Sequence, residues 1–170
     1  SDAFCKRLVG QTIDRMERRG KYLLMRLNSS DRVVIHLRMT GCLLYTPADL
    51  PQEKHTHITF QLHNGKELRF SDTRRFGRLW LIASGEADPY SGIEKLGKEP
   101  FDPDLCAEYL RARLGNRKKA IKECLLEQGL IAGIGNIYSD EILFAAKIYP
   151  ARPAKALTEQ EWTRLAAAIP

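Results

Sequence analysis

Residues 133–138, Gly-Ile-Gly-Asn-Ile-Tyr, place two glycines and a polar side chain at the start of an apolar helical pattern. Gly133 and Gly135 can adopt backbone conformations closed to other residues and can approach a ligand closely. The first turn of a helix has unpaired N–H groups and a positive dipole end, which favour a phosphate. Asn136 can either cap this helix or donate its amide to the phosphate. The segment predicts either a phosphate-binding turn or an ordinary corner between two core helices.

A run of basic residues precedes this turn. Six lie between positions 111 and 122 with no acid among them: Arg111, Arg113, Arg117, Lys118, Lys119 and Lys122. A solvated helix face is one reading of such a run, and it stays open. The glycine turn that follows favours the other reading, in which the run is a phosphate-binding surface for nucleic acid.

A second basic cluster surrounds an aromatic residue. Arg74, Arg75 and Arg78 flank Phe76 in the segment Ser-Asp-Thr-Arg-Arg-Phe-Gly-Arg. An arginine can pair with a phosphate or a base edge, while a neighbouring ring stacks on bases or wedges between them. The alternative is a strand with Phe76 in the core and the arginines in water.

Several other residues have side chains capable of chemistry. Taken alone, His36 is expected to be a structural histidine and Met39 to fill the core. The remaining histidines have no acidic or cysteine partner at ligand spacing, so we expect no metal site: His55, His57 and His63. The cysteines are scattered singly without a Cys-x-x-Cys pair, which excludes a zinc ribbon, and we expect buried free thiols: Cys5, Cys42, Cys106 and Cys124.

Composition and charge narrow the class of protein. The chain has 170 residues, 44% of them hydrophobic, which is enough for the core of one large domain or two small ones. Its net charge of +6 suits a polyanionic partner, either nucleic acid or an acidic membrane surface. No apolar run is long enough to span a bilayer and no signal sequence opens the chain, so we expect a cytoplasmic protein.

The first half of the chain predicts antiparallel β-structure. Apolar runs at 21–27, 33–39 and 77–84 have the length and composition of strands. In 57–72, apolar and polar residues alternate on both sides of Asn64-Gly65, a pair typical of a type I′ hairpin turn. The charged opening segment is compatible with a helix that leads into a strand. We expect a β half over residues 1–84, truncated at its N-terminus.

The second half predicts helices. Residues 85–103 hold three prolines and many charges, which is typical of an inter-domain linker. Apolar residues then recur at helical spacing in 104–114, 117–128, 136–148 and 157–169. Asp104 is available as a helix start, and Thr158 with Glu161 forms a capping-box pattern. The expected fold class is α+β, with the β half followed by a helical domain over 104–170.

Four segments, in this order, carry a resemblance to a known family: Glu-Arg-Arg-Gly-Lys-Tyr-Leu-Leu at 17–24, His-Leu-Arg-Met-Thr-Gly at 36–41, Leu-Arg-Phe-Ser-Asp-Thr-Arg-Arg-Phe-Gly-Arg-Leu at 68–79, and Gly-Ile-Gly-Asn-Ile-Tyr-Ser-Asp-Glu-Ile-Leu-Phe at 133–144. Their order and spacing resemble the bacterial formamidopyrimidine-DNA glycosylase family over nearly the whole chain. That family has an N-terminal β-sandwich and a helical domain with a helix–two-turn–helix motif, and it binds damaged DNA between them. The resemblance therefore implies a β-sandwich over residues 1–84, truncated at its N-terminus, and a helix–two-turn–helix domain over 104–170, truncated at its C-terminus.

The resemblance implies roles for individual residues. The expected phosphate contacts are Lys21, His36, Lys122 and Asn136. Met39, Arg74 and Phe76 would fill the hole left by a flipped base. Arg74 would face the orphaned partner base, and Phe76 would wedge the stack.

The resemblance also implies chemistry that these residues do not hold. The family's nucleophile is the secondary amine of an N-terminal proline, followed by a glutamate general acid, whereas this chain begins with Ser1. We therefore expect no catalytic residue and no cofactor in this chain. One zinc ion is expected in a C-terminal finger of the full-length protein. Because the helical pattern also runs to the last residues, we interpret the chain as an internal piece of a longer protein.

The leading hypothesis is base-excision repair. In the full-length protein we expect a bifunctional DNA glycosylase and AP lyase that excises oxidised purines, with this chain alone inactive. Met39 followed by Arg-Arg-Phe-Gly favours the purine branch over the related endonuclease VIII branch. The expected partner is damaged double-stranded DNA, bound by a monomer, with no membrane partner. The alternative hypothesis is a non-catalytic nucleic-acid-binding module with the same helix–two-turn–helix motif, and the β half speaks against it.

Overall fold

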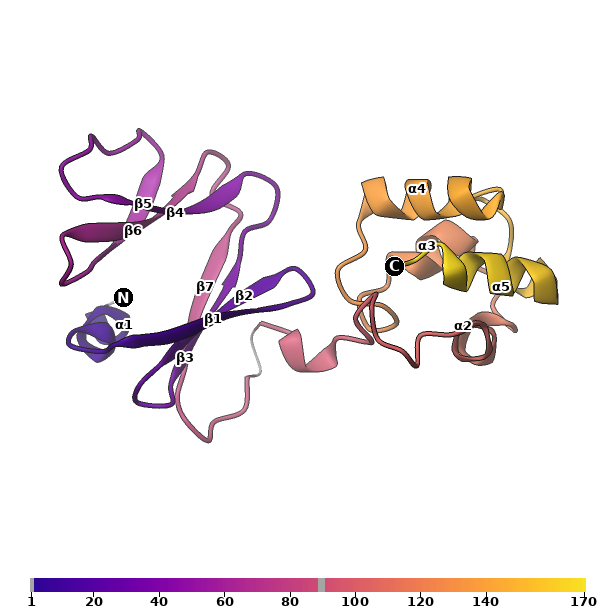
Figure 1. Ribbon diagram of the computed structural model, residues 1–170, viewed down its shortest axis with the longest axis horizontal. Coiled ribbons are helices and arrows are strands. Elements are labelled where there is room, and N and C mark those ends of the chain that lie inside the picture. The colour runs from indigo at the N-terminus through magenta and orange to yellow at the C-terminus, as the bar shows by residue number, and fades with distance from the viewer. Residues whose placement is uncertain (1, 89–90) are drawn as a thin grey trace. The chain divides into compact units, whose positions relative to one another are not determined.

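The computed structural model describes residues 2–88 and 91–170 (Figure 1). The chain divides into two compact units, residues 1–91 and residues 92–170, called here the β unit and the helical unit. The division falls within the stretch 85–103. Gly97 and Lys98 from this stretch hydrogen bond to Gln128 and Leu130, so that part packs into the helical unit.

The β unit consists of one helix and two antiparallel sheets. Its elements are α1 (Asp2–Leu8), β1 (Ile13–Arg19), β2 (Tyr22–Leu27), β3 (Arg32–His36), β4 (Gly41–Pro47), β5 (Thr56–Gln61), β6 (Lys66–Asp72) and β7 (Arg78–Ile82). One sheet has the strand order β1-β2-β3-β7 and the other the order β4-β6-β5. The strand predicted over 33–39 is wrong at its end, because β3 ends at His36 and Met39 lies in the following loop.

The core of the β unit lies between the two sheets and α1. Met25, Val33 and Ile35 of the first sheet are buried against Leu43 and Leu68 of the second. The helix contributes apolar side chains to the same cluster. Burial of apolar side chains from both sheets stabilises the sandwich, because each removes hydrocarbon surface from water.

The hairpin between β5 and β6 differs from the predicted turn. Only Gly65 has a positive φ, of 74°, so the type I′ turn at Asn64-Gly65 is wrong. Gly65 N–H donates to Leu62 O, and Leu62 N–H donates to Lys66 O across the loop. The loop is therefore one residue longer than a two-residue turn, and a single left-handed glycine closes it.

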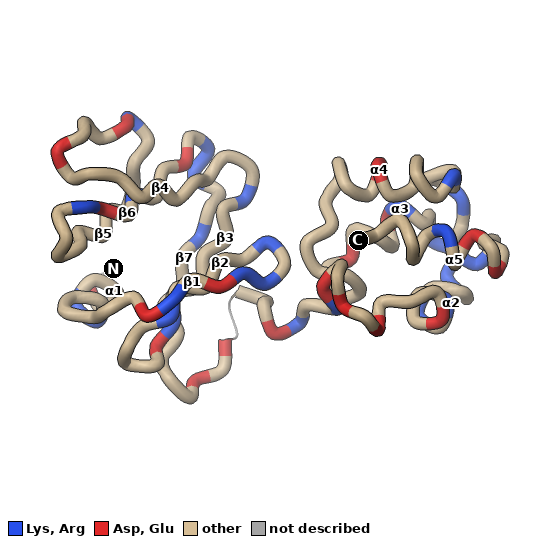
Figure 2. Tube along the Cα trace, in the orientation of Figure 1, with Lys and Arg blue, Asp and Glu red and all other residues tan. Residues whose placement is uncertain are grey.

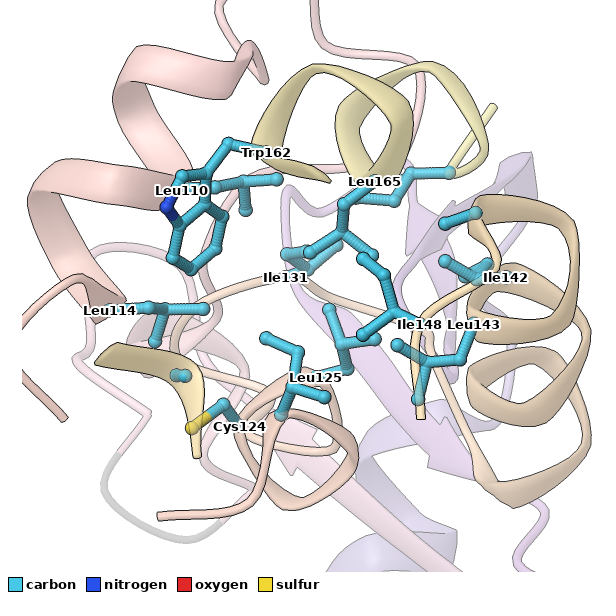
Figure 3. Packing of buried hydrophobic residues seen from close by; sticks show 14 of the residues in the cluster. Leu110, Leu114, Cys124, Leu125, Ile131, Ile142, Leu143, Ile148, Trp162 and Leu165 are labelled. Atoms are coloured by element: carbon cyan, nitrogen blue, oxygen red, sulfur yellow. The ribbon is translucent and has the colours of Figure 1, made fainter. Parts of the chain in front are cut away.

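The helical unit is built from η1 (Ile93–Lys95), α2 (Ala107–Leu114), α3 (Ile121–Leu125), α4 (Asn136–Ala146), η2 (Ala154–Ala156) and α5 (Glu159–Ala167). Its core gathers apolar side chains from all four α-helices, as Figure 3 shows. Leu110 of α2, Leu125 of α3, Leu143 of α4 and Trp162 of α5 are all buried there. Among the described residues, no helix is long and apolar enough to cross a membrane.

Two predicted helices begin later than expected. Asp104 does not start α2, because Cys106 is the N-cap and the Asp104 carboxylate pairs with Lys98 at 3.1 Å. The helix predicted over 117–128 is confined to five residues, since Ile121 N–H donates to Arg152 O, which belongs to a distant loop. The predicted capping box of Thr158 and Glu161 is confirmed at the start of α5.

The free cysteines are not uniformly buried. Cys124 lies in the helical core, but Cys5 and Cys106 are exposed and Cys42 is intermediate. The expectation of buried thiols is therefore wrong for the two exposed ones. Cys5 lies on α1 and Cys106 is the N-cap of α2, both at the surface, so residue type alone does not set burial.

Candidate nucleic-acid interface

The topology of the β unit brings two distant loops side by side. We call residues 37–40 and 73–77 the loop pair; the first joins β3 to β4 and the second joins β6 to β7. His36 pairs with Arg78 in the first sheet, and Gly41 pairs with Asp72 in the second. Each loop therefore joins one of the neighbouring strands β3 and β7 of the first sheet to one of the neighbouring strands β4 and β6 of the second, at the same end of the sandwich.

The loop pair brings Met39, Arg74 and Phe76 into one exposed cluster. Arg74 Nη1 lies 3.2 Å from Met39 Sδ, and its guanidinium carbon lies 4.8 Å from the centroid of the Phe76 ring. Met39 is 74% exposed and Phe76 is 48% exposed. The expectation, drawn from residue type alone, that Met39 lies in the core is therefore wrong, and so is the alternative that Phe76 lies in the core. A cation lies between a flexible thioether and an aromatic face, all open to solvent.

A buried carboxylate, which sequence reasoning missed, connects the two loops. Asp72 is 1% exposed. Its Oδ1 accepts the Thr40 hydroxyl at 2.5 Å and the Arg74 N–H at 3.1 Å, and its Oδ2 accepts the Gly77 N–H at 2.8 Å. These hydrogen bonds, led by that of Thr40, lower the pKa of Asp72 to about 2. Thr40 lies 32 residues before Asp72, so the sequence around Asp72 gives no indication of this contact.

Strain accompanies this arrangement. Arg38 and Arg75 have φ values of 58° and 57°, in the left-handed region that favours glycine. Each directly precedes a member of the exposed cluster, Met39 or Phe76. Such residues cost about 1–2 kcal/mol each and persist only where the surrounding structure determines them.

His36 and Lys21 lie close together in the β unit. The His36 ring packs edge-on against Tyr22, with centroids 4.7 Å apart, and its Nδ1 accepts the Arg38 N–H at 3.0 Å. Burial, then the charges of Arg38 and Lys21, lowers the pKa of His36. Partial burial also lowers the pKa of Lys21. His36 is consequently neutral at pH 7, with Nε2–H as its donor.

The glycine turn of the helical unit has one left-handed residue. Gly133 has a φ of 92°, whereas Gly135 is extended, with a φ of −120°. Gly135 is also the N-cap of α4, and no side chain caps the helix, so the plain capping role for Asn136 is wrong. Asn136 is the first residue of α4 and is exposed.

Gln128 holds this turn and was not anticipated. Its Nε2 donates to Leu126 O at 3.1 Å and to Ile134 O at 2.7 Å, while its Oε1 accepts the Gly133 N–H at 3.0 Å. One side chain thereby holds the end of α3, at Leu126, and the glycine turn at Gly133 and Ile134. The sequence around Gln128 gives no indication of this role.

The basic run 111–122 is largely paired with acids from elsewhere in the helical unit. The ion pairs are Arg111–Glu159, Arg117–Glu127, Lys119–Glu127 and Lys122–Asp140. Figure 2 shows acidic positions interspersed with the basic ones in this unit. The run is therefore less positive than its sequence suggests, because partners distant in sequence balance it.

Lys122 and Asn136 lie near one another. Lys122 Nζ is 2.8 Å from Asp140 Oδ1. Asp140 follows Asn136 by four residues on α4, so the two side chains share one helix face. Of the predicted site residues, Met39, Arg74 and Phe76 thus form one group. Lys21 with His36 forms a second, and Lys122 with Asn136 a third.

The residues described here do not fit a zinc site. Across 2–88 and 91–170, no three His, Cys, Asp or Glu side chains lie close enough to hold a metal ion. His57 Nε2 instead lies 2.8 Å from Asp72 O.

Each of the two units matches a known protein domain. Residues 1–79 match the formamidopyrimidine-DNA glycosylase N-terminal domain, and residues 96–170 match the formamidopyrimidine-DNA glycosylase H2TH domain. The chain belongs to the formamidopyrimidine-DNA glycosylase family. Formamidopyrimidine-DNA glycosylases of Moorella thermoacetica and Desulforamulus reducens are each 49% identical to it over 99% of this chain and 61% of their own length. The chain thus spans about three fifths of these formamidopyrimidine-DNA glycosylases.

Solved structures of the family agree in fold. Lactococcus lactis Fpg in complex with DNA containing an abasic site matches with a TM-score of 0.91 at 39% identity, over 99% of this chain and 62% of that one. The same enzyme with DNA containing Fapy-dG matches with a TM-score of 0.91 at 39% identity, over 99% and 63%. The predicted fold class, antiparallel β-sheets followed by a helix–two-turn–helix domain, is confirmed.

Proposed function

We propose that this chain recognises damaged duplex DNA for base-excision repair. In the full-length protein it would serve the excision of oxidised purines, that is, oxidised guanine and formamidopyrimidines, by a bifunctional DNA glycosylase and AP lyase. The observation that carries the proposal is the exposed cluster of Met39, Arg74 and Phe76 on the loop pair. The relatives bound to abasic-site and Fapy-dG DNA support it.

The cluster has the properties required to fill the space of a flipped base. Flipping costs a few kcal/mol of stacking and pairing, which inserted side chains offset. Phe76 supplies a flat ring for the wedge, and Met39 supplies a flexible apolar chain that fits an irregular gap. Arg74 supplies the guanidinium that can donate to the edge of the orphaned base.

The other site residues suit phosphate. Neutral His36 donates through Nε2–H, and Lys21 adds positive charge beside it. In the helical unit, Lys122 of α3 contacts Asp140 on the face of α4 that also carries Asn136, and the N–H groups of the first turn of α4 add their dipoles. Contacts of this kind fix the register of the protein on DNA without reading sequence.

The excision chemistry belongs to the full-length protein in this proposal. The amine of an N-terminal proline would bond to the sugar C1′ as the bond to the damaged base breaks, and the resulting Schiff base would then permit strand cleavage. We place this proline outside residues 1–170, and the zinc ion in a C-terminal finger. The protein would act as a monomer on DNA in the bacterial cytoplasm.

The test compares two duplexes. Fluorescence anisotropy measures the affinity of the chain for DNA with a central tetrahydrofuran abasic analogue and for intact DNA of the same sequence. We expect tighter binding to the abasic duplex, and Phe76→Ala should reduce this preference. Tyr45→Ala is the matched control, because Tyr45 is an exposed aromatic of the same unit outside the loop pair. Equal affinity for both duplexes would refute the proposal.

A further inference from the structure

Side-chain contacts must hold the two loops of the loop pair together, because no strand pairing is described between 37–40 and 73–77. The described contacts between 37–40 and 73–77 are the Arg74–Met39 contact, the bond from Arg74 N–H to Thr40 Oγ1 at 3.3 Å, and the bonds that both loops make to Asp72. The first of these is exposed to solvent. Asp72, by contrast, is buried.

Asp72 receives donors from both loops. Thr40 donates its hydroxyl from the first loop, while Arg74, Phe76 and Gly77 donate backbone N–H groups from the second. A carboxylate accepts through both oxygens and donates nothing, so it can serve all of these groups together. An amide of the same shape has one acceptor oxygen and would turn an NH2 group toward backbone donors.

The space around this carboxylate is closely filled. A Cβ on Gly77 would lie 2.4 Å from Phe70 Cζ and 3.2 Å from Asp72 Oδ2. The second loop therefore passes against the sheet at a glycine, and its N–H groups are directed at Asp72. The strained backbone of Arg38 and Arg75 on either side is the kind of conformation that persists only under such constraint.

We propose that Asp72, with Thr40 as its partner, is a positioning residue that sets discrimination between damaged and intact DNA by holding Met39, Arg74 and Phe76 in one cluster. It does not touch DNA. Its effect passes through the geometry of the loop pair. This inference rests on the proposed function, since the cluster's role in DNA is assumed there.

Two isosteric variants separate positioning from general stability. Asp72→Asn removes acceptor capacity, and Thr40→Val removes the hydroxyl, whereas Thr40→Ser keeps it. The control is Asp31→Asn. Asp31 is a buried carboxylate at the other end of β3, where it accepts Arg7 at 2.7 Å and the Ser84 N–H at 2.9 Å.

The first measurement is the ratio of abasic-duplex to intact-duplex affinity, together with the melting temperature. We expect Asp72→Asn and Thr40→Val to lower the ratio about tenfold, which corresponds to the loss of one charge-assisted hydrogen bond. Thr40→Ser and Asp31→Asn should retain the native ratio. A native ratio in folded Asp72→Asn and in Thr40→Val would overturn the inference. If Asp72→Asn does not fold, the Thr40 pair decides alone.

The second measurement needs no DNA. The methyl group of Met39, labelled with carbon-13, reports its contact with Arg74 by NMR, and Arg74→Ala gives the signal of the released methyl. Asp72→Asn and Thr40→Val should move the Met39 signal toward that position, while Asp31→Asn should not. If the Met39 signal shifts in these variants but the unsubstituted chain binds abasic and intact DNA equally, the proposed function is refuted, while the role of Asp72 in holding the cluster together stands. An unmoved signal would refute the positioning role itself.

Discussion

Replacing Gln128 by alanine should destabilise the helical unit more than its half-buried position suggests. The side chain makes three hydrogen bonds, to Leu126 O, Ile134 O and the Gly133 N–H. Each such bond contributes about 0.5–1.5 kcal/mol, so their joint loss predicts about 2–4 kcal/mol of lost unfolding free energy. Gln128→Glu should cost nearly as much, because it keeps the acceptor for Gly133 but loses both donations.

Urea unfolding followed by tryptophan fluorescence measures this loss. The chain has two tryptophans, and Trp162 is buried in the helical core, so a Trp80→Phe background reports the helical unit alone. Gln160→Ala is the control, because Gln160 is an exposed glutamine of α5. If the urea midpoint of Gln128→Ala equals that of the control, the side chain does not hold the turn and the reasoning fails.

Three further outcomes follow from the geometry. Met39→Ala and Phe76→Ala should each lower the free energy of unfolding by about 2 kcal/mol or less, because Met39 is exposed and Phe76 is about half exposed, whereas truncating a fully buried side chain lowers it by about 2–5 kcal/mol. A larger loss in thermal or urea unfolding would make them core residues. Asp140→Asn should raise affinity for intact duplex up to about fivefold at low salt, because it releases Lys122 from an exposed ion pair worth at most about 1 kcal/mol; unchanged anisotropy titrations would contradict this. The pKa of Asp72 is lowered from 3.8 to about 2, so its stabilising contribution is complete above pH 3.8 and is lost as the pH falls toward 2. In the folded chain the Met39 methyl signal should change as the pH passes about 2, where Asp72 becomes protonated, and should not change there in Asp72→Asn.

One chemical prediction concerns the nucleophile. Borohydride should trap no covalent adduct between the purified 170-residue chain and abasic DNA, since no N-terminal proline amine is present in it. Gel electrophoresis of the reduced mixture detects such an adduct. Trapping by this chain would show that another amine, such as that of Lys21, can substitute.

Local patterns predicted the elements that local physics determines. The alternation around residues 57–72 predicted the β5–β6 hairpin, and the Thr158 and Glu161 spacing predicted a cap that the structure confirms. In both cases the partners are close in sequence. The predicted type I′ turn at Asn64-Gly65 was wrong because the loop is one residue longer, and the preference of this dipeptide does not determine the loop length.

Features that depend on distant partners were not predictable in the same way. The run 117–128 has helical spacing, yet its first residues bond to a loop near Arg152 instead. Lys122 of this run is paired with Asp140 on α4, a partner that a scan of the run itself cannot find. The sequence around Asp72 does not indicate its role, because that role depends on β3 and β7 of one sheet and β4 and β6 of the other meeting at the same end of the sandwich.

The ion pair between Lys122 and Asp140 changes how salt would act on the proposed complex. Binding of a lysine to a DNA phosphate normally releases about one condensed cation into solution. Lys122 must first leave Asp140, whose carboxylate then attracts a cation of its own. The net release at this position is therefore smaller than one. The slope of log affinity against log salt concentration should accordingly underestimate the number of basic side chains that touch DNA, and Asp140→Asn should make it steeper.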